Sequence, residues 1–242
     1  MAERLTDRVM VVTGASRGIG EQIALACAGE KAKLVLVART PEDLERVRGR
    51  AMEAGSEDVL TVTTDITKEE EVEVMYDVIL SRFGRVDILV NNAGIAFFKS
   101  VLDTTAAEWQ AMFDLNVKGL FLCSRGAVAA MKEQGGGHII NISSVAGREP
   151  IANFAGYSAT KYAVQGFADA LRQEVRSFGI KVTNILPGFT ATEATGVAAE
   201  QAYEKGAVKP GDVAQAVVFA AAQPKQVLIH ELVITPTVEA EF

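Results

Sequence analysis

Short apolar runs alternate with longer amphipathic segments along most of this chain. Runs rich in β-branched residues are typical of buried strands, whereas apolar residues that recur every three or four positions are typical of helices packed on one side. The apolar runs predict strands at residues 8–13, 33–38, 59–63, 86–90, 138–142, 181–186 and 227–235. Helical periodicity predicts helices at residues 21–30, from Pro41 onward, 68–83, 109–132, 156–178 and from Pro210 onward.

The alternation of strands and helices defines the expected fold class. Strands joined through helices form a parallel sheet with right-handed crossovers, and helices then cover both faces of that sheet. We therefore predict an α/β, doubly wound Rossmann fold with a seven-stranded parallel sheet. No linker, internal repeat or low-complexity segment divides residues 1–242, so a single domain is expected. Ligands of such sheets bind at the carboxyl ends of the strands.

A glycine-rich segment, GASRGIG at residues 14–20, separates the first strand from the first helix. Glycines in this place permit a tight turn, and they let the backbone approach a phosphate at the positive end of the helix. A plain turn is the alternative reading. The position between a strand and a helix favours a dinucleotide-binding loop.

Tyr157 and Lys161 stand four residues apart at the start of a predicted helix, and Ser144 follows the fifth strand. Side chains four residues apart lie on one helix face, so the lysine ammonium can lie beside the phenol. A neighbouring cation lowers the pKa of a phenol toward neutral pH. The pattern therefore indicates that Tyr157 is a general acid/base, although a surface pair of the same spacing is the alternative.

Asn116 lies within the apolar stripe of the helix predicted at 109–132. A buried amide needs hydrogen-bond partners. Asn116 could satisfy a bend in the helix, serve an active site, or do both.

Composition narrows the possible partners. The 242 residues carry a net charge of −7 and a pI near 5.0, which argues against nucleic acid or an anionic membrane as a partner. The first eight residues do not resemble a signal peptide, and no apolar stretch reaches the roughly 18 residues of a membrane span. We expect a cytoplasmic protein.

The cysteines and histidines show no metal-binding pattern. Cys27 and Cys123 occur in apolar helical surroundings and are expected to be buried, reduced thiols. His138 and His230 have no ligand-like neighbours in the sequence, so no metal site is expected.

Four ordered motifs together resemble the short-chain dehydrogenase/reductase family over nearly the whole chain. They are TGASRGIG at 13–20, NNAG at 91–94, NISS with YSATK within 141–161, and PGFTAT at 187–192. The resemblance implies hydride transfer with a nicotinamide cofactor, Tyr157 as the acid/base and Ser144 as the hydroxyl that orients a substrate carbonyl. It further implies that Lys161 lowers the pKa of Tyr157 and holds the nicotinamide ribose, while Asn116 holds a water in a proton relay.

The predicted cofactor site collects residues from all of these motifs and from the ends of the second and third strands. Its members are Gly14, Ser16, Arg17, Gly18, Ile19, Gly20, Arg39, Asp65, Ile66, Asn92, Ala93, Gly94, Tyr157, Lys161, Pro187, Gly188, Thr190 and Thr192.

The end of the second strand bears on the choice of cofactor. An acid there would accept the ribose hydroxyls of NAD, but Ala38, Arg39 and Thr40 provide no carboxylate. Arg39, joined by Arg17 from the glycine loop, can instead bind a 2′-phosphate. We therefore predict that NADP(H) is preferred and that NAD is possible. The alternative is that both arginines are solvated surface residues.

The last residues, ELVITPTVEAEF, have Pro236 where many family members carry a glycine pair. This ending resembles a subgroup of reductases and of dehydrogenases that act on hydroxy acids or aldehydes. The leading hypothesis is an NADP(H)-dependent oxidoreductase that interconverts a carbonyl and an alcohol. The alternatives are an NAD-linked dehydrogenase of a small hydroxy acid or 3-hydroxy amino acid, and a non-catalytic dinucleotide sensor.

Two further expectations concern assembly and specificity. The helices at 109–132 and 156–178 carry more apolar positions than one face against the sheet requires, and matching helices pair between subunits in the family. A homo-oligomer, a tetramer or dimer, is therefore expected. Substrate specificity is expected to reside in residues 189–208 together with 144–154.

Overall fold

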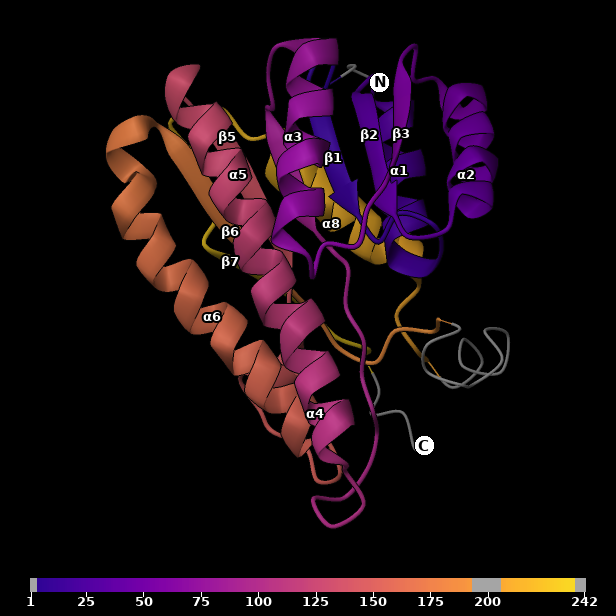
Figure 1. Cartoon of the computed structure of the whole chain (residues 1–242), viewed down its shortest axis with the longest axis vertical. Helices are drawn as coiled ribbons and strands as arrows, with labels where there is room; N and C mark the ends of the chain where they lie inside the picture. Colours follow the sequence, from indigo (N-terminus) through magenta and orange to yellow (C-terminus); the bar gives the residue numbers. More distant parts are fainter. Residues whose placement is uncertain (1–3, 193–205, 238–242) are drawn as a thin grey trace.

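Seven parallel strands form one sheet in the order β3–β2–β1–β4–β5–β6–β7 (Figure 1). The computed structural model describes residues 4–192 and 206–237. The predicted doubly wound fold is confirmed. The strands are β1 (Val9–Thr13), β2 (Lys33–Ala38), β3 (Val59–Thr63), β4 (Ile88–Asn91), β5 (Gly137–Ile142), β6 (Ile180–Pro187) and β7 (Glu231–Ile234).

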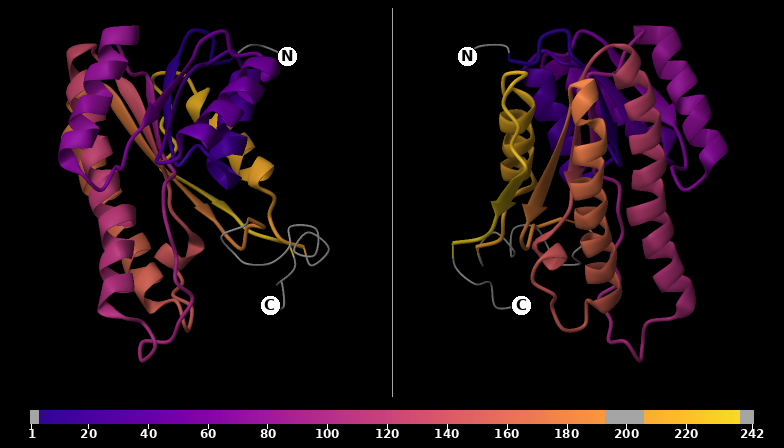
Figure 2. Two further views of the ribbon diagram at one scale, coloured as in Figure 1. Left: turned by 45° about the vertical axis from the view of Figure 1, so that its right-hand side comes forward. Right: turned by 90° about the vertical axis from the view of Figure 1, so that its left-hand side faces the viewer.

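Helices cover both faces of the sheet (Figure 2). On one face lie α1 (Gly18–Gly29), α2 (Pro41–Ala54) and α8 (Pro210–Ala221), whose apolar residues share one core with alternate residues of the strands. On the other face, α3 (Glu69–Phe83), α5 (Leu120–Glu133) and α6 (Ala155–Val175) share a second core. The central strands are therefore buried on both sides, as their continuous apolar runs predict.

The helix predicted at 109–132 is interrupted. It consists of α4 (Ala106–Phe113), a π-helical segment η1 (Asp114–Gly119) and α5. Its start lies earlier than predicted, because Thr105 and Glu108 form a capping box. The π-helical segment admits one more residue per turn, and such bulges are frequent at functional sites.

The seventh strand is shorter than predicted. Residues 227–229 lie outside the ladder with β6, and β6 side chains instead bind two of their carbonyls. Lys181 Nζ donates to the Val227 carbonyl at 3.3 Å, and Thr183 Oγ1 donates to the Ile229 carbonyl at 2.6 Å. The Asn184 N–H then donates to the His230 carbonyl at 3.0 Å, and the strand itself begins at Glu231.

Two short 3₁₀ segments flank α6. The first, η2 (Val145–Gly147), connects β5 to the loop before α6, and the second, η3 (Arg176–Phe178), extends α6 toward the predicted end of the helix. Gly179 then ends the segment in the left-handed region at φ 71°.

The predicted state of the cysteines is confirmed. Cys27 and Cys123 are free and buried, and burial raises the pKa of each thiol to about 12. Across residues 4–192 and 206–237, the helices are too short or too polar to cross a membrane. The same ranges contain no cluster of three metal-ligating side chains.

Candidate functional site

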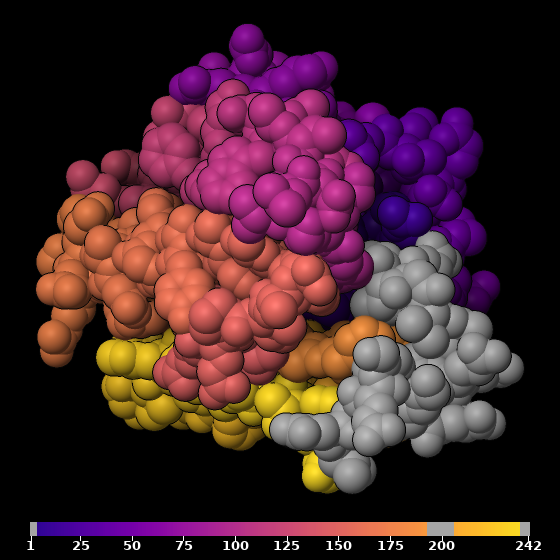
Figure 3. All heavy atoms as spheres, turned by 90° about the horizontal axis from the view of Figure 1, so that it is seen from below, coloured from indigo at the N-terminus to yellow at the C-terminus, as the bar shows by residue number. Residues whose placement is uncertain are grey.

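A cleft of about 420 Å³ opens at the carboxyl edge of the sheet, where segments from distant parts of the sequence meet (Figure 3). The strand order reverses between the neighbouring strands β1 and β4, because the chain crosses over from β3 to β4, and open α/β sheets bind ligands at such a point. The predicted cofactor residues that line the cleft are Gly14, Ser16, Arg17, Gly18, Ile19, Arg39, Asp65, Ile66, Asn92, Ala93, Gly94 and Thr192.

Three glycines of the loop, Gly14, Gly18 and Gly20, stand where a side chain would not fit the backbone. Gly14 and Gly18 have φ of 63° and 58°, a region that residues with a Cβ rarely adopt. A Cβ on Gly20 would lie 2.1 Å from the Gly14 carbonyl oxygen and 2.5 Å from Asn92 Nδ2. The loop can therefore close over the start of α1 only with glycine in these places. Such a cradle at a helix N-terminus fits a pyrophosphate.

Thr13, which the sequence reasoning did not select, connects the glycine loop to the NNAG segment. Its hydroxyl accepts hydrogen bonds from the backbone N–H groups of Asn92 (3.0 Å) and Ala93 (3.1 Å). Asn92 Nδ2 in turn donates to the Thr13 carbonyl at 2.9 Å. The sequence did carry a signal for this role: Thr13 is a hydroxyl residue at the end of a buried strand, directly before the first glycine of the loop.

The end of β2 presents Arg39 in an exposed position at the cleft. The structure also brings Asp43, from the first turn of α2, into the same lining. The sequence reasoning examined residues 38–40 and missed this carboxylate, because the first turn of a helix folds back over the preceding strand end. Arg46 Nε lies 4.0 Å from Asp43 Oδ1 and partly neutralises it.

Asp65 is engaged within its own loop. Its Oδ1 accepts hydrogen bonds from the backbone N–H (3.1 Å) and the hydroxyl (2.8 Å) of Thr67. Asp65 and Ile66 thus line the cleft at the end of β3, with the Asp65 carboxylate turned onto the turn that precedes α3.

Ser144 and Tyr157 come together in the structure. The Ser144 hydroxyl accepts a hydrogen bond from the Ala146 N–H at 3.1 Å and donates to the Pro187 carbonyl at 3.5 Å, and its interaction with the Tyr157 phenol lowers the pKa of that phenol. The 3₁₀ turn after β5 and the start of α6 hold these two hydroxyls in place, although thirteen residues separate them in sequence.

Lys161 lies one turn further along α6 and is buried. Its Nζ donates to the Ile142 carbonyl at 2.9 Å and lies 5.5 Å from the centroid of the Tyr157 ring. Burial lowers the pKa of Lys161 to about 8. The predicted spacing on one face of a helix is thus realised.

The prediction that the pKa of Tyr157 is lowered was wrong. Burial raises the pKa of Tyr157 to about 12, and the interaction with Ser144 opposes this shift only in part. The Lys161 ammonium, which was expected to lower the pKa of the phenol, is instead directed at the Ile142 carbonyl. Desolvation therefore outweighs the charge effect.

Asn116 occupies the π-helical segment and is buried. Its Oδ1 accepts from the Ile95 N–H (2.8 Å), while its Nδ2 donates to the Ile95 carbonyl (2.8 Å) and to Thr160 Oγ1 (3.1 Å). Asn116 thus holds the segment after NNAG against the neighbour of Lys161 on α6. Asn116 therefore lies at an irregularity of the helix, as one of the alternatives predicted. Its amide also contacts α6, the candidate catalytic helix.

The PGFTAT segment continues β6 toward the cleft. The Gly188 N–H donates to the Ile234 carbonyl at 2.7 Å, and a Cβ on Gly188 would lie 3.1 Å from Pro236. Pro236 therefore packs on the turn at Pro187 and Gly188. Thr190 donates to the Gly188 carbonyl at 3.0 Å, whereas Thr192 reaches the cleft. Residues 193–205 of the predicted specificity segment lie outside the described residues.

The cleft lining also includes residues that the sequence reasoning did not select. They lie at or just after strand ends, in the first turn of α2 and in the π-helical segment: Val37, Ala38, Thr40, Asp43, Thr64, Ile95 and Leu115. Eight predicted site residues are not part of the cleft lining: Gly20, Asn116, Ser144, Tyr157, Lys161, Pro187, Gly188 and Thr190.

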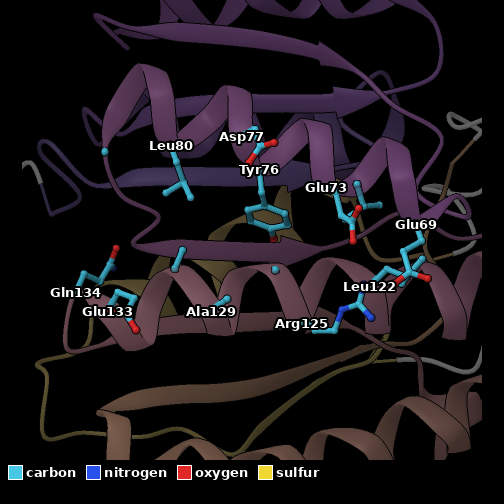
Figure 4. Close-up of a pocket in the computed structure, with 14 residues that line it drawn as sticks. Glu69, Glu73, Tyr76, Asp77, Leu80, Leu122, Arg125, Ala129, Glu133 and Gln134 are labelled. Atoms are coloured by element: carbon cyan, nitrogen blue, oxygen red, sulfur yellow. Dashed lines mark hydrogen bonds and ion pairs between the residues drawn. The ribbon is translucent and has the colours of Figure 1, made fainter.

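A second hollow, of about 860 Å³, lies between α3 and α5 (Figure 4). Tyr76 points between the two helices, and Glu69, Glu73, Asp77 and Glu133 border the hollow. It contains none of the candidate catalytic or cofactor-binding residues. The cleft at the carboxyl edge of the sheet is therefore the candidate site, although the hollow between α3 and α5 is larger.

Comparison with known proteins places the chain in a family. Residues 8–202 match the model of the short chain dehydrogenase family, and the chain belongs to that family. An uncharacterized oxidoreductase of Staphylococcus aureus strain USA300 is 40% identical over 232 residues, which span 96% of this chain and 98% of the relative. The protein is thus an oxidoreductase of the short-chain dehydrogenase/reductase family that uses NAD(P).

Three solved structures share the fold along nearly the whole chain. A metagenomic short-chain oxidoreductase in complex with NADP is 34% identical, with a TM-score of 0.85 over 98% of this chain and 100% of that chain. An alcohol dehydrogenase from Thermococcus sibiricus, complexed with 5-hydroxy-NADP, is 31% identical, with a TM-score of 0.90 over 97% and 99%. A serine dehydrogenase complexed with NADP⁺ is 31% identical, with a TM-score of 0.86 over 93% and 94%.

Proposed function

We propose that this protein is an NADP(H)-dependent oxidoreductase that interconverts a ketone or aldehyde and the corresponding alcohol. The observation that carries the proposal is the interaction of the Ser144 hydroxyl with the Tyr157 phenol, one helical turn from the buried Lys161. Two neutral hydroxyl donors in that place suit a carbonyl oxygen that gains negative charge during reduction.

The cradle fits the cofactor, whose nicotinamide supplies or accepts the hydride when bound. In this proposal Gly14, Gly18 and the N-terminus of α1 bind the pyrophosphate, because these glycines carry no side chain where a phosphate must approach. Asn92 and Ala93 set the opposite wall through their contacts with Thr13.

Tyr157 holds the proton that the carbonyl oxygen receives. Its raised pKa keeps the phenol protonated at neutral pH, which is the form that reduction needs. Ser144 donates the second hydrogen bond to the same oxygen and thereby orients the carbonyl. In the oxidative direction the same phenol must lose its proton, and the charge of Lys161 favours that loss once its Nζ turns toward the phenol. Asn116 is proposed to hold a water that resupplies the proton.

The preference for NADP(H) is proposed on two grounds. Arg39 is exposed at the end of β2, where the 2′-position of a bound dinucleotide is expected, and the neighbouring Ala38 provides no carboxylate to oppose a phosphate. The structures of a metagenomic oxidoreductase, an alcohol dehydrogenase and a serine dehydrogenase were all solved with NADP or a derivative of it.

A second candidate function is the oxidation of a small hydroxy acid or 3-hydroxy amino acid. The likeness to a serine dehydrogenase supports it. A non-catalytic dinucleotide sensor is disfavoured, because a protein that only binds has no need of a Ser144 hydroxyl that interacts with Tyr157.

An absorbance assay tests the proposal. The purified chain is mixed with NADPH and a panel of ketones and aldehydes, and with NADP⁺ and a matching panel that contains alcohols, hydroxy acids and serine. Loss of reduced nicotinamide with at least one carbonyl supports the proposal. Turnover confined to hydroxy acids or serine favours the second candidate, and binding of NADPH without turnover on either panel favours the sensor.

The assembly prediction concerns the outer surface of α4, α5 and α6. Trp109 and Phe121 are 43% and 41% exposed, and Phe121 meets Phe167 of α6 edge to face at 6.2 Å. Large aromatic side chains that remain exposed on neighbouring helices are typical of interfaces. We expect light scattering at micromolar concentration to give a homotetramer or a dimer. A monomeric mass would contradict this prediction.

A further inference from the structure

Glu231, the first residue of β7, receives hydrogen bonds from two directions. The guanidinium of Arg148, from the loop after η2, donates to its Oε2, and Gln165 Nε2 of α6 donates to its Oε1 at 2.6 Å. One carboxylate therefore connects the last strand of the sheet, the loop that follows Ser144 and the helix that carries Tyr157.

Both partners of Glu231 stand next to the candidate catalytic groups. Arg148 lies four residues after Ser144, and Gln165 lies four residues, or one helical turn, after Lys161. The Arg148 carbonyl also accepts a hydrogen bond from the hydroxyl of Tyr162 on α6.

The loop after Ser144 lies directly on α6. A Cβ on Gly147 would come within 2.9 Å of the Lys161 carbonyl oxygen, so the backbones of the loop and the helix are in close contact. The position of the Ser144 loop is thus set by its contact with this helical turn. A shift of the loop by a fraction of an ångström would alter the Ser144 to Tyr157 geometry.

Glu231 is itself attached to the interior of the sheet. Asn91, Asn141 and Asn184 are in register on β4, β5 and β6, and Asn184 is in register with Glu231. Asn91 donates to Asn141 (2.9 Å), Asn141 to Asn184 (3.0 Å), and Asn184 to Gln165 (2.6 Å). The three asparagines are buried, so this row of amides connects Gln165 and Glu231 to a rigid part of the core.

We propose that Glu231 is a positioning residue for the reaction: it holds the loop after Ser144 against α6 and so maintains the alignment of the Ser144 and Tyr157 hydroxyls. Glu231 acts through Arg148 and Gln165, and it touches neither substrate nor cofactor in this proposal. The inference rests on the proposed carbonyl chemistry, because only a reaction that uses both hydroxyls is sensitive to their alignment.

The test is Glu231→Gln, which keeps a side-chain oxygen for Gln165 and removes the charge that pairs with Arg148. We expect kcat for the best carbonyl of the panel to fall about 5- to 20-fold, the scale of a sub-ångström misalignment. The KM for NADPH and its dissociation constant should stay within about twofold, because the glycine cradle is untouched.

Asp58→Asn is the matched control. It breaks the Arg82–Asp58 pair, whose side chains are 56% and 26% exposed, against 54% and 20% for Arg148–Glu231. Asp58 precedes β3, at the opposite edge of the sheet from the cleft. We expect kcat of this variant to stay within about 1.5-fold of the unmodified enzyme.

A double-mutant cycle separates positioning from a general loss of stability. Arg148→Gln should lower kcat to a similar extent, and the double variant should be no slower than the slower single variant, because the two side chains act as one unit. Additive losses, or a kcat of Glu231→Gln within twofold of the unmodified enzyme, would overturn the inference.

Hydrogen exchange supplies a readout that needs no substrate. The Gly147 and Arg148 N–H groups donate to the Ser144 and Val145 carbonyls at 2.9 Å each. Their exchange should be at least about fivefold faster in Glu231→Gln and unchanged in Asp58→Asn. If the unmodified chain reduces no carbonyl, the proposed function fails. Unchanged exchange of the Gly147 and Arg148 N–H groups in Glu231→Gln would contradict the proposal that Glu231 holds this loop against α6.

Discussion

Tyr157→Phe is expected to lower kcat for carbonyl reduction by at least about 100-fold, the usual contribution of a positioned general acid. The substitution keeps the ring and removes only the hydroxyl that interacts with Ser144. NADPH binding, measured by fluorescence titration, should change little, since the cradle is formed by the glycine loop and the residues around Asn92. Steady-state kinetics with saturating NADPH measures the loss.

Tyr76→Phe is the matched control for this experiment. Tyr76 is buried, and its hydroxyl donates to the Cys123 carbonyl at 2.6 Å, between α3 and α5 (Figure 4). Its loss should cost about 1 kcal/mol of folding stability and leave kcat within about twofold. Retention of most activity in Tyr157→Phe would rule out the assignment of Tyr157 as the acid/base.

The second large effect concerns the cofactor's 2′-phosphate. We expect kcat/KM to favour NADPH over NADH by about 10- to 1,000-fold, the range for one or two charge-assisted hydrogen bonds of about 1.5–3 kcal/mol each, partly offset by desolvation. The Asp43 carboxylate in the cleft lining repels a phosphate. The expected preference for NADPH is therefore smaller than Arg39 and Arg17 would give together. Parallel kinetics with both cofactors measures the ratio.

The Ala38→Asp, Arg39→Gln double variant should move the preference toward NADH. The new carboxylate can accept the ribose hydroxyls and repels a 2′-phosphate, while the guanidinium is removed. Arg48→Gln serves as the control, because Arg48 is a similarly charged residue of α2 that pairs with Glu45 and lies outside the cleft lining. Equal kcat/KM for the two cofactors in the unmodified enzyme would refute the predicted role of Arg39.

Local signals explain why much of the fold could be predicted. The strands Lys33–Ala38 and Val59–Thr63 have the predicted bounds, because each apolar run is bounded by polar or helix-starting residues. Pro41 begins α2 as expected, since its missing N–H costs nothing in the first turn of a helix. The order of strands and helices along the chain then leaves few possible topologies.

The candidate site was predictable where the chemistry is local in sequence. The glycine loop is a continuous segment, and Tyr157 and Lys161 share one helical face, so their proximity follows from helix geometry alone. Ser144 and the cleft residues at strand ends followed from parallel strands that finish at a common edge.

Features that depend on packing between distant segments were not predictable. Asp43 enters the cleft because α2 folds back over the end of β2, and side chains of β6 bind the carbonyls that precede the short β7.

The chain by itself determined the strand and helix pattern, the glycine cradle and the identity of the candidate catalytic groups, because each depends on residues close together in sequence. Only the tertiary structure decided the electrostatic state of Tyr157 and the attachment of the Ser144 loop. The pKa of Tyr157 depends on how much water the surrounding elements exclude, and Glu231 meets Arg148 across 83 residues of sequence only after β7 has joined the sheet.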